Sequence, residues 1–125
     1  MRRIFVVGSL RRGEYNHRRF EGFADGFAGT ATAAGFVLKD LGEFPAMVPS
    51  TDPRDLVVGE LYDVSDDLAH ALDRFEANDG YFPRPLTVVD QLGVAITAEA
   101  YCIEKPDSVA HHATVPGGDW VKRGA

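Results

Sequence analysis

One stretch of this chain, residues 66–76, has the spacing of apolar side chains that is typical of an amphipathic α-helix. Leu68, Leu72 and Phe75 recur at three- and four-residue intervals, which places them on one stripe of a helix with 100° per residue. Ser65 precedes the stretch as a candidate N-cap, and acidic residues occupy the first turn, where the helix dipole favours them. With one clear helix, a doubly wound fold with helices between its strands is disfavoured.

The other regular segments are short runs rich in β-branched and aromatic residues, which favour strands. We predict strands over residues 4–7, 30–38, 43–49, 56–64, 86–89 and 94–103, and a short second helix over residues 15–20. The strand 4–7 is expected to be buried on both faces, and the prolines in 43–49 restrict that segment to a sheet edge. The last two strands form a predicted hairpin, and the tail after Pro106 is expected to be irregular. The fold class is therefore α+β, with a small β-barrel or strongly curled sheet flanked by one or two helices.

Length and composition restrict the classes of function that remain open. The chain has 125 residues, which predicts one domain over residues 1–125. Its net charge of −6 argues against a nucleic-acid partner, because such surfaces need a basic stripe. The apolar run at residues 4–7 is too short for a signal peptide or a membrane span. The single cysteine, Cys102, excludes an internal disulfide, and we expect a cytoplasmic protein without a membrane partner.

Glu76 stands out among the acidic residues because it lies one turn beyond Leu72, at the edge of the apolar stripe. A carboxylate there faces the core side of the helix, and it also lies at the negative end of the helix dipole. Both effects raise a carboxyl pKa, which is typical of functional acids. The alternative is that the helix ends one residue earlier and that Glu76 turns into solvent.

The loop that follows the first strand is the second candidate. A strand that ends in Gly8-Ser9 presents consecutive backbone N–H groups, which can hold an anion. The loop lacks the pattern of a phosphate-binding P-loop, and an ordinary turn is the alternative interpretation. No histidine lies at metal-ligand spacing from another histidine or a cysteine, so we expect no metal site. Cys102, Tyr62 and Tyr101 fall within predicted strands and are interpreted as core residues.

Two segments in combination resemble the γ-glutamylcyclotransferase-like superfamily, and above all its short members of the γ-glutamylamine cyclotransferase type. They are Phe5-Val6-Val7-Gly8-Ser9-Leu10-Arg11-Arg12-Gly13 and Leu72-Asp73-Arg74-Phe75-Glu76, the latter followed by Arg84. Gly59-Glu60-Leu61-Tyr62 and Gly118-Asp119-Trp120 add to the likeness, which runs from about Ile4 to Trp120. The resemblance implies a small mixed β-barrel flanked by helices, with no cofactor or metal.

The resemblance also implies roles for individual residues. The backbone of Gly8, Ser9 and Leu10 would hold the glutamyl part of a substrate, and Glu76 would be the catalytic acid/base. Val7, Phe82 and Arg84 complete the implied substrate-binding set. The family usually has an aromatic residue in place of Val7 and tyrosine in place of Phe82, although Tyr81 is adjacent; it usually has glycine in place of Ala77.

The implied reaction is the intramolecular cyclisation of a γ-glutamyl amine or γ-glutamyl amino acid, which releases 5-oxoproline and the free amine. A non-catalytic module that binds a small acidic or amino-acid ligand on the same fold is the alternative, favoured by Val7 and Phe82 and opposed by Glu76. The expected partner is a small molecule, and the sequence carries no signal for the oligomeric state.

Overall fold

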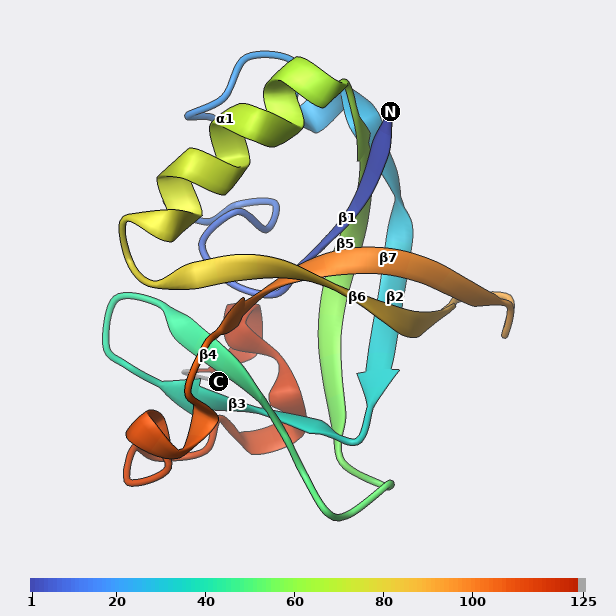
Figure 1. Cartoon of the computed structure of the whole chain (residues 1–125). Helices are drawn as coiled ribbons and strands as arrows, with labels where there is room; N and C mark the ends of the chain where they lie inside the picture. The colour runs from blue at the N-terminus through green and yellow to red at the C-terminus, as the bar shows by residue number, and fades with distance from the viewer. Residues whose placement is uncertain (124–125) are drawn as a thin grey trace.

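Five strands form a closed mixed barrel in the computed structural model, which describes residues 1–123 (Figure 1). In barrel order they are β1 (Arg2–Val6), β5 (Leu56–Val64), β2 (Phe27–Ala34), β6 (Tyr81–Asp90) and β7 (Ala95–Ile103). Neighbouring strands are antiparallel except β7 and β1, which are parallel and close the barrel. The predicted fold class, an α+β chain with a small mixed barrel and one α-helix, is confirmed.

A separate two-stranded hairpin packs beside the barrel, and it corrects one predicted strand. It consists of β3 (Phe36–Asp40) and β4 (Pro45–Pro49). The single strand predicted over residues 30–38 is wrong, because the chain turns at Gly35 and the two halves join different sheets. Gly35 has a φ of 80°, a conformation that glycine adopts without strain. The proline-bounded β4 pairs only with β3, so the predicted edge position is confirmed.

Helix α1 (Asp66–Ala77) confirms the predicted amphipathic helix. The Ser65 hydroxyl accepts a hydrogen bond from the Leu68 N–H at 3.2 Å, as expected of an N-cap. Ala69 and Leu72 are fully buried on the inward face, and burial of a leucine side chain stabilises the fold by roughly 1.5–3 kcal/mol. In Figure 1 the helix lies across the barrel near β1 and β6.

Two predictions outside the barrel are wrong. Residues 15–20 form consecutive turns and not a helix. The tail after Pro106 is more ordered than expected: three of the four described 3₁₀ helices lie there, the set being η1 (Ala24–Gly26), η2 (Pro106–Val109), η3 (Pro116–Gly118) and η4 (Trp120–Lys122). The tail is held because Trp120 is fully buried and because Gly118 approaches the Leu56 carbonyl too closely for any side chain.

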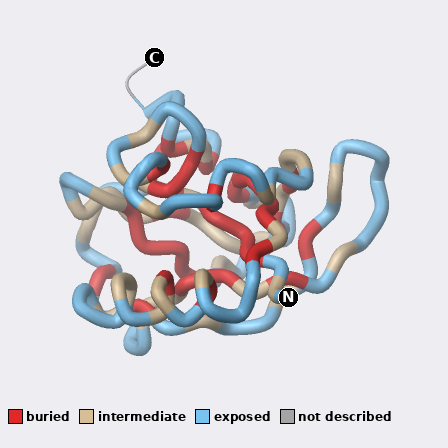
Figure 2. Tube along the Cα trace, turned by 90° about the horizontal axis from the view of Figure 1, so that it is seen from above, coloured by how far each residue is buried: buried red, intermediate tan, exposed pale blue. Residues whose placement is uncertain are grey.

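The buried side chains form two clusters, and strand β1 contributes to both. Ile4 and Val6 pack in the cluster that includes Leu72 of α1, whereas Phe5 packs in the cluster that includes Trp120. Successive side chains of a strand point to opposite faces, so the predicted burial of this strand on both faces is confirmed. Figure 2 shows the buried segments enclosed by exposed loops. No helix described in residues 1–123 is long and apolar enough to cross a membrane.

Strand β6 is longer than predicted and begins at Tyr81, directly after Gly80. The prediction started at Leu86, whereas the observed strand also contains Pro83 and Pro85, residues that are unfavourable in central strands. In the structure Pro83 faces Tyr101 and Pro85 faces Glu99 on β7. This five-residue extension decides which side chains of β6 reach the pocket described below.

Candidate functional site

An open pocket lies between the end of β1, the end of α1 and the hairpin β3–β4. Its walls come from four regions that are far apart in the sequence: residues 5–16, 44–45, 75–81 and 101. The lining residues are Phe5, Val6, Val7, Gly8, Ser9, Leu10, Asn16, Phe44, Pro45, Phe75, Glu76, Asp79, Tyr81 and Tyr101. Val7, Gly8, Ser9, Leu10 and Glu76, which the sequence singled out, are thus brought together in one pocket.

Glu76 supplies the pocket with a carboxyl group of unusual pKa. Helix α1 continues to Ala77, so the alternative in which Glu76 turns into solvent is wrong, and the residue follows Leu72 by one turn on the inward side. Burial raises the pKa of Glu76 to about 7, with a further contribution from the negative charge of Asp79. At neutral pH this carboxyl exchanges a proton readily in either direction, which is what a general acid/base requires.

A second set of polar groups in the pocket comes from the loop after β1. Within residues 1–123 the backbone N–H groups of Gly8, Ser9 and Leu10 donate no hydrogen bond. Their carbonyl groups, in contrast, accept hydrogen bonds of 2.8–3.0 Å from the following turn, donated by Arg11, Asn16 and the His17 ring. Three consecutive N–H groups without an acceptor, in residues that line the pocket, can donate to an anionic oxygen.

Buried charges hold this loop in place. Glu60 of β5 accepts hydrogen bonds from the Arg11 Nε at 3.0 Å, the Arg12 backbone N–H at 2.8 Å and the Tyr62 hydroxyl at 2.9 Å. Arg11 also donates to Asp119 at 2.7 Å. Both Arg11 and Glu60 are almost completely buried, and removing one partner of such a pair costs about 3–5 kcal/mol. The network therefore fixes the donor loop to the barrel and to the C-terminal tail.

Gly8 is required by close packing rather than by backbone conformation. A Cβ atom at this position would lie 2.6 Å from Cδ of Pro45 on β4, well inside van der Waals contact. Because Pro45 also lines the pocket, the hairpin β3–β4 packs directly on the donor loop. A side chain at residue 8 would push these two walls apart.

Two tyrosines line the pocket and were missed by the sequence analysis as site residues. The Tyr81 hydroxyl donates a hydrogen bond to the Pro45 carbonyl at 3.1 Å, and the Tyr101 hydroxyl donates to Asp73 at 2.7 Å. Burial, assisted for both by the charge of Glu76, raises their pKa values above the ordinary range. Tyr101 belongs to a buried core cluster, as predicted, and it also lines the pocket. The register of the β6–β7 hairpin, which places Tyr101 opposite Pro83 near the pocket end, is the signal that could have found it.

Phe82 and Arg84, which the resemblance implied as substrate-binding residues, do not line the pocket with Glu76, and their role toward a substrate stays a prediction. They lie with Cys102 and Glu104 around a separate outer groove. The reason is strand alternation: Tyr81 points inward at the start of β6, so residues 82 and 84 point outward. Ala77, a further departure from the family pattern, is exposed and does not line the pocket.

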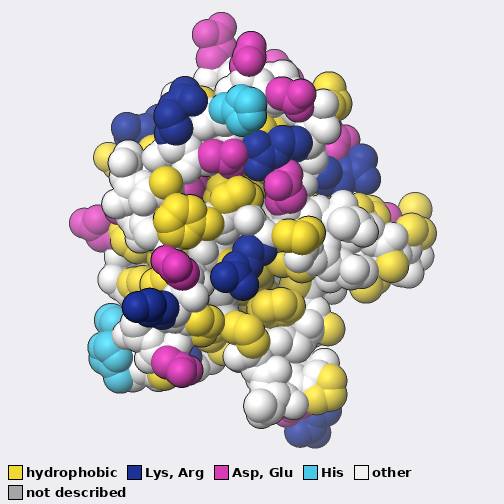
Figure 3. All heavy atoms as spheres, viewed as in Figure 1, with side chains coloured by type: hydrophobic (Ala, Val, Ile, Leu, Met, Phe, Trp, Pro, Cys, Tyr) yellow, Lys and Arg dark blue, Asp and Glu magenta, His cyan; other side chains and the backbone are white. Residues whose placement is uncertain are grey.

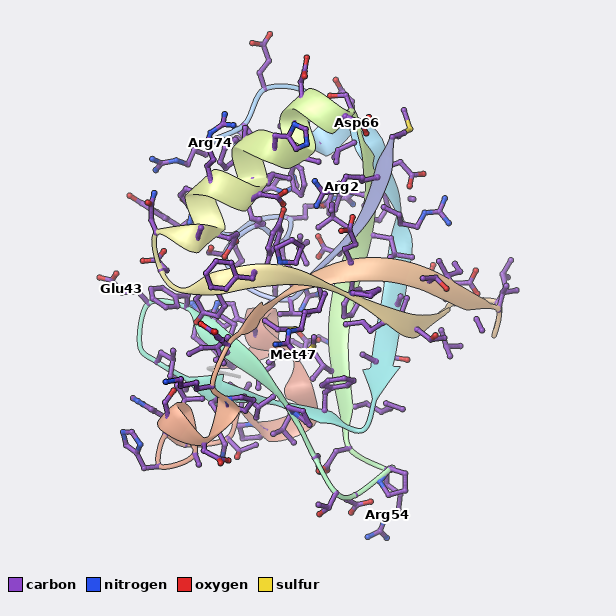
Figure 4. All side chains as sticks on the ribbon, in the orientation of Figure 1. Arg2, Glu43, Met47, Arg54, Asp66 and Arg74 are labelled. Carbon is purple, nitrogen blue, oxygen red and sulfur yellow. The ribbon has the colours of Figure 1, made fainter. Side chains whose placement is uncertain are left out.

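An ionic cluster connects α1 to the barrel beside the pocket. Arg2 of β1 donates to both oxygens of Asp73 at 2.8 and 3.0 Å, and to both oxygens of Glu99 at 2.7 and 3.2 Å. Figure 4 shows Arg2 in the space between α1 and the strands, whereas Arg74 points outward from the helix. In Figure 3 charged side chains gather over α1, and hydrophobic ones gather below it. The cluster fixes the angle at which α1 presents Glu76 to the pocket.

Comparison with known proteins identifies the family. The sequence matches the model of the family described as gamma-glutamyl cyclotransferase, AIG2-like, over residues 4–122. The chain belongs to this family. No curated protein sequence matches it.

Among the described residues, no group of three or more His, Cys, Asp or Glu side chains is arranged to hold a metal ion.

Several solved structures share the fold of this family member. An AIG2-like protein from mouse is 26% identical, with a TM-score of 0.75, and the match covers 91% of this chain and 85% of that one. An uncharacterized protein from Pyrococcus horikoshii is 24% identical with a TM-score of 0.72, covering 98% and 92% of the two chains. A protein named gamma-glutamyl cyclotransferase is 20% identical with a TM-score of 0.70, covering 90% and 68%.

Proposed function

We propose that this chain cyclises a γ-glutamyl amide, releasing 5-oxoproline and the free amine, with Glu76 as the general acid/base. One observation carries the proposal: Glu76, whose carboxyl has a raised pKa, lines the same pocket as Gly8, Ser9 and Leu10. The backbone N–H groups of these three residues are free to bind a substrate. Membership of the gamma-glutamyl cyclotransferase, AIG2-like family supports the reaction class.

The reaction needs orientation and proton transfer. The nucleophile and the electrophile belong to one molecule, and holding them in attack geometry can lower the barrier by about 7–11 kcal/mol in the best cases. A substrate α-amino group has a pKa near about 8 and arrives mainly as ammonium. The ionised Glu76 takes a proton from it, and the free amine attacks the γ-carbonyl. Protonated Glu76 then delivers this proton to the departing nitrogen as the C–N bond breaks, and the ring nitrogen, which carries one extra proton after the attack, gives that proton back to Glu76 as the neutral lactam forms. Glu76 passes it on to the released amine, which leaves as ammonium.

The donor loop supplies the electrostatic part of the mechanism. Its N–H groups belong to residues that line the pocket, where they would donate to a substrate carboxylate or to the developing oxyanion, both of which bear negative charge. A donor of this kind is worth roughly 10²–10³ in kcat where it contacts the oxyanion. Because Arg11 and Glu60 fix the loop before the substrate arrives, the donors need little reorganisation.

The test is an assay for 5-oxoproline with a panel of γ-glutamyl amines, γ-glutamyl amino acids and glutathione. The proposal requires turnover of at least one compound and its loss in Glu76→Gln, which keeps the shape of the side chain. Glu104→Gln is the matched control, because Glu104 is an exposed glutamate outside the pocket. Equal activity of the two variants would exclude the assigned role of Glu76.

A non-catalytic binding module is the second candidate, and Val7 is the observation that favours it. Val7 lines the pocket where the family usually has an aromatic residue, so one contact to the substrate is smaller here. A calorimetric titration separates the two functions: saturable binding of a γ-glutamyl compound with no product formed would favour the binding module.

A further inference from the structure

The hydroxyl group of Tyr101 is restricted to one hydrogen-bonding role in the pocket. A tyrosine hydroxyl carries a single proton, and Tyr101 donates it to Asp73 Oδ1 at 2.7 Å. The Tyr101 oxygen can therefore act toward the pocket only as an acceptor. Tyr101 is a lining residue, 9% exposed, so few water molecules compete for that oxygen.

Asp73 is kept ionised, which is the form that accepts the hydrogen bond from Tyr101. Burial alone would raise the pKa of Asp73, but hydrogen bonds from Arg2 and Tyr101 outweigh it and lower the pKa below its usual value. Arg2 contacts both Asp73 oxygens at 2.8 and 3.0 Å and is itself held by Glu99. An ionised carboxylate can only accept hydrogen bonds, so the direction of the bond from Tyr101 is fixed across the neutral pH range.

The hydrogen bonds within the protein also decide which other polar groups of the pocket can donate to a ligand and which can accept. Tyr81 donates its proton to the Pro45 carbonyl at 3.1 Å, and therefore also presents an acceptor. The Ser9 hydroxyl accepts a hydrogen bond from Asn16 at 2.9 Å, which leaves its proton available next to the free N–H groups of the loop. The pocket thus contains acceptors, namely Glu76 and two phenol oxygens, and donors, namely the Ser9 hydroxyl and the loop N–H groups.

We propose that Asp73 is a positioning residue that fixes the Tyr101 hydroxyl proton, so that the Tyr101 oxygen accepts a hydrogen bond from the α-ammonium group of the substrate. The inference rests on the proposed function, because it assumes a γ-glutamyl substrate with a free α-amino group. A pocket that contains both donors and acceptors matches such a zwitterionic head, with its carboxylate on the loop and its ammonium near Glu76. The Tyr101 contact would direct the amine toward the carboxyl that removes its proton.

The test compares two ligands that differ only in the α-amino group: γ-glutamyl-n-butylamide as substrate and N-butylglutaramic acid as competitive inhibitor. In Tyr101→Phe, which keeps the ring, we expect the KM of the substrate to rise roughly ten-fold or more, since hydrogen bonds to charged groups are strong. The inhibition constant of the des-amino compound should stay within about two-fold, because that compound never had the contact.

Asp73→Asn supplies the second arm, because an amide can donate to the Tyr101 oxygen and turn the hydroxyl proton into the pocket. We expect the same selective rise in KM, and no further rise when Asp73→Asn is added to Tyr101→Phe. Urea denaturation of all variants identifies any loss of folding. Additive effects, or equal weakening of both ligands, would show that Asp73 acts only by holding α1 and would overturn the inference alone. Absence of turnover by the unaltered protein would overturn the proposed function and this inference together.

Discussion

Replacement of Glu76 by glutamine changes how the stability of this protein depends on pH, and the structure gives the size of the change. The pKa of Glu76 rises from 4.5 to about 7 on folding, mainly through burial. Between these two values the folded chain binds more protons than the unfolded chain, so the free energy of unfolding must fall as the pH rises through this window. Well below pH 4.5 the carboxyl is protonated in both the folded and the unfolded chain, and its ionisation no longer affects stability.

The magnitude follows from the change in pKa. One pKa unit corresponds to about 1.36 kcal/mol, so ionisation of Glu76 costs the folded state at most about 3.4 kcal/mol, of which about 2.5 kcal/mol develops between pH 5 and pH 8. Glutamine has the same shape and does not ionise. Glu76→Gln should therefore gain up to about 2.5 kcal/mol over the unaltered protein when the pH is raised from 5 to 8.

Urea denaturation at pH 5, 6, 7 and 8 measures this difference. Trp120 is the single tryptophan and is fully buried, so its fluorescence reports global unfolding. Glu104→Gln, an exposed control, should follow the pH dependence of the unaltered protein. If the stability of Glu76→Gln and of the unaltered protein changes in parallel with pH, Glu76 is not held in a desolvated pocket, and the reasoning about its pKa is refuted.

Three further predictions concern activity and the donor loop. The rate constant kcat/KM should fall as the pH drops below about 7, because the raised pKa of Glu76 leaves less of the ionised base; a flat profile from pH 5 to 8 would contradict this. Gly8→Ala should lower stability by roughly 1–3 kcal/mol in urea denaturation and reduce turnover, since its Cβ would meet Pro45; wild-type stability and activity would show that the hairpin yields. Glu60→Gln should cost about 3–5 kcal/mol, because it leaves the buried Arg11 without a full counter-charge; an effect below about 1 kcal/mol would mean that water reaches the pair.

Local patterns were sufficient for elements whose ends are marked by the chain itself. The strand Leu56–Val64 was predicted with the observed bounds, and the helix that starts after Ser65 was predicted to within one residue of its end. In both cases a change of periodicity or a cap coincides with the boundary. The strand predicted across Gly35 failed because the same β-forming residues continue on both sides of the glycine, and only pairing partners show that the chain changes sheet.

For the candidate site, too, some features could be predicted from local sequence and others depended on tertiary structure. The sequence by itself predicted that Gly8-Ser9 ends a buried strand and placed Glu76 at the edge of the apolar stripe of a helix, since both follow from local spacing; it left open whether Glu76 turns into solvent, which the continuation of the helix to Ala77 decided. Tertiary structure alone decided that these two features share one pocket, that Tyr81 and Tyr101 complete it, and that Phe82 and Arg84 lie outside it. The physical reason is register: the point at which β6 begins and its pairing with β7 select which alternate side chains face inward. That choice is made by contacts across the barrel and not by neighbours in the chain.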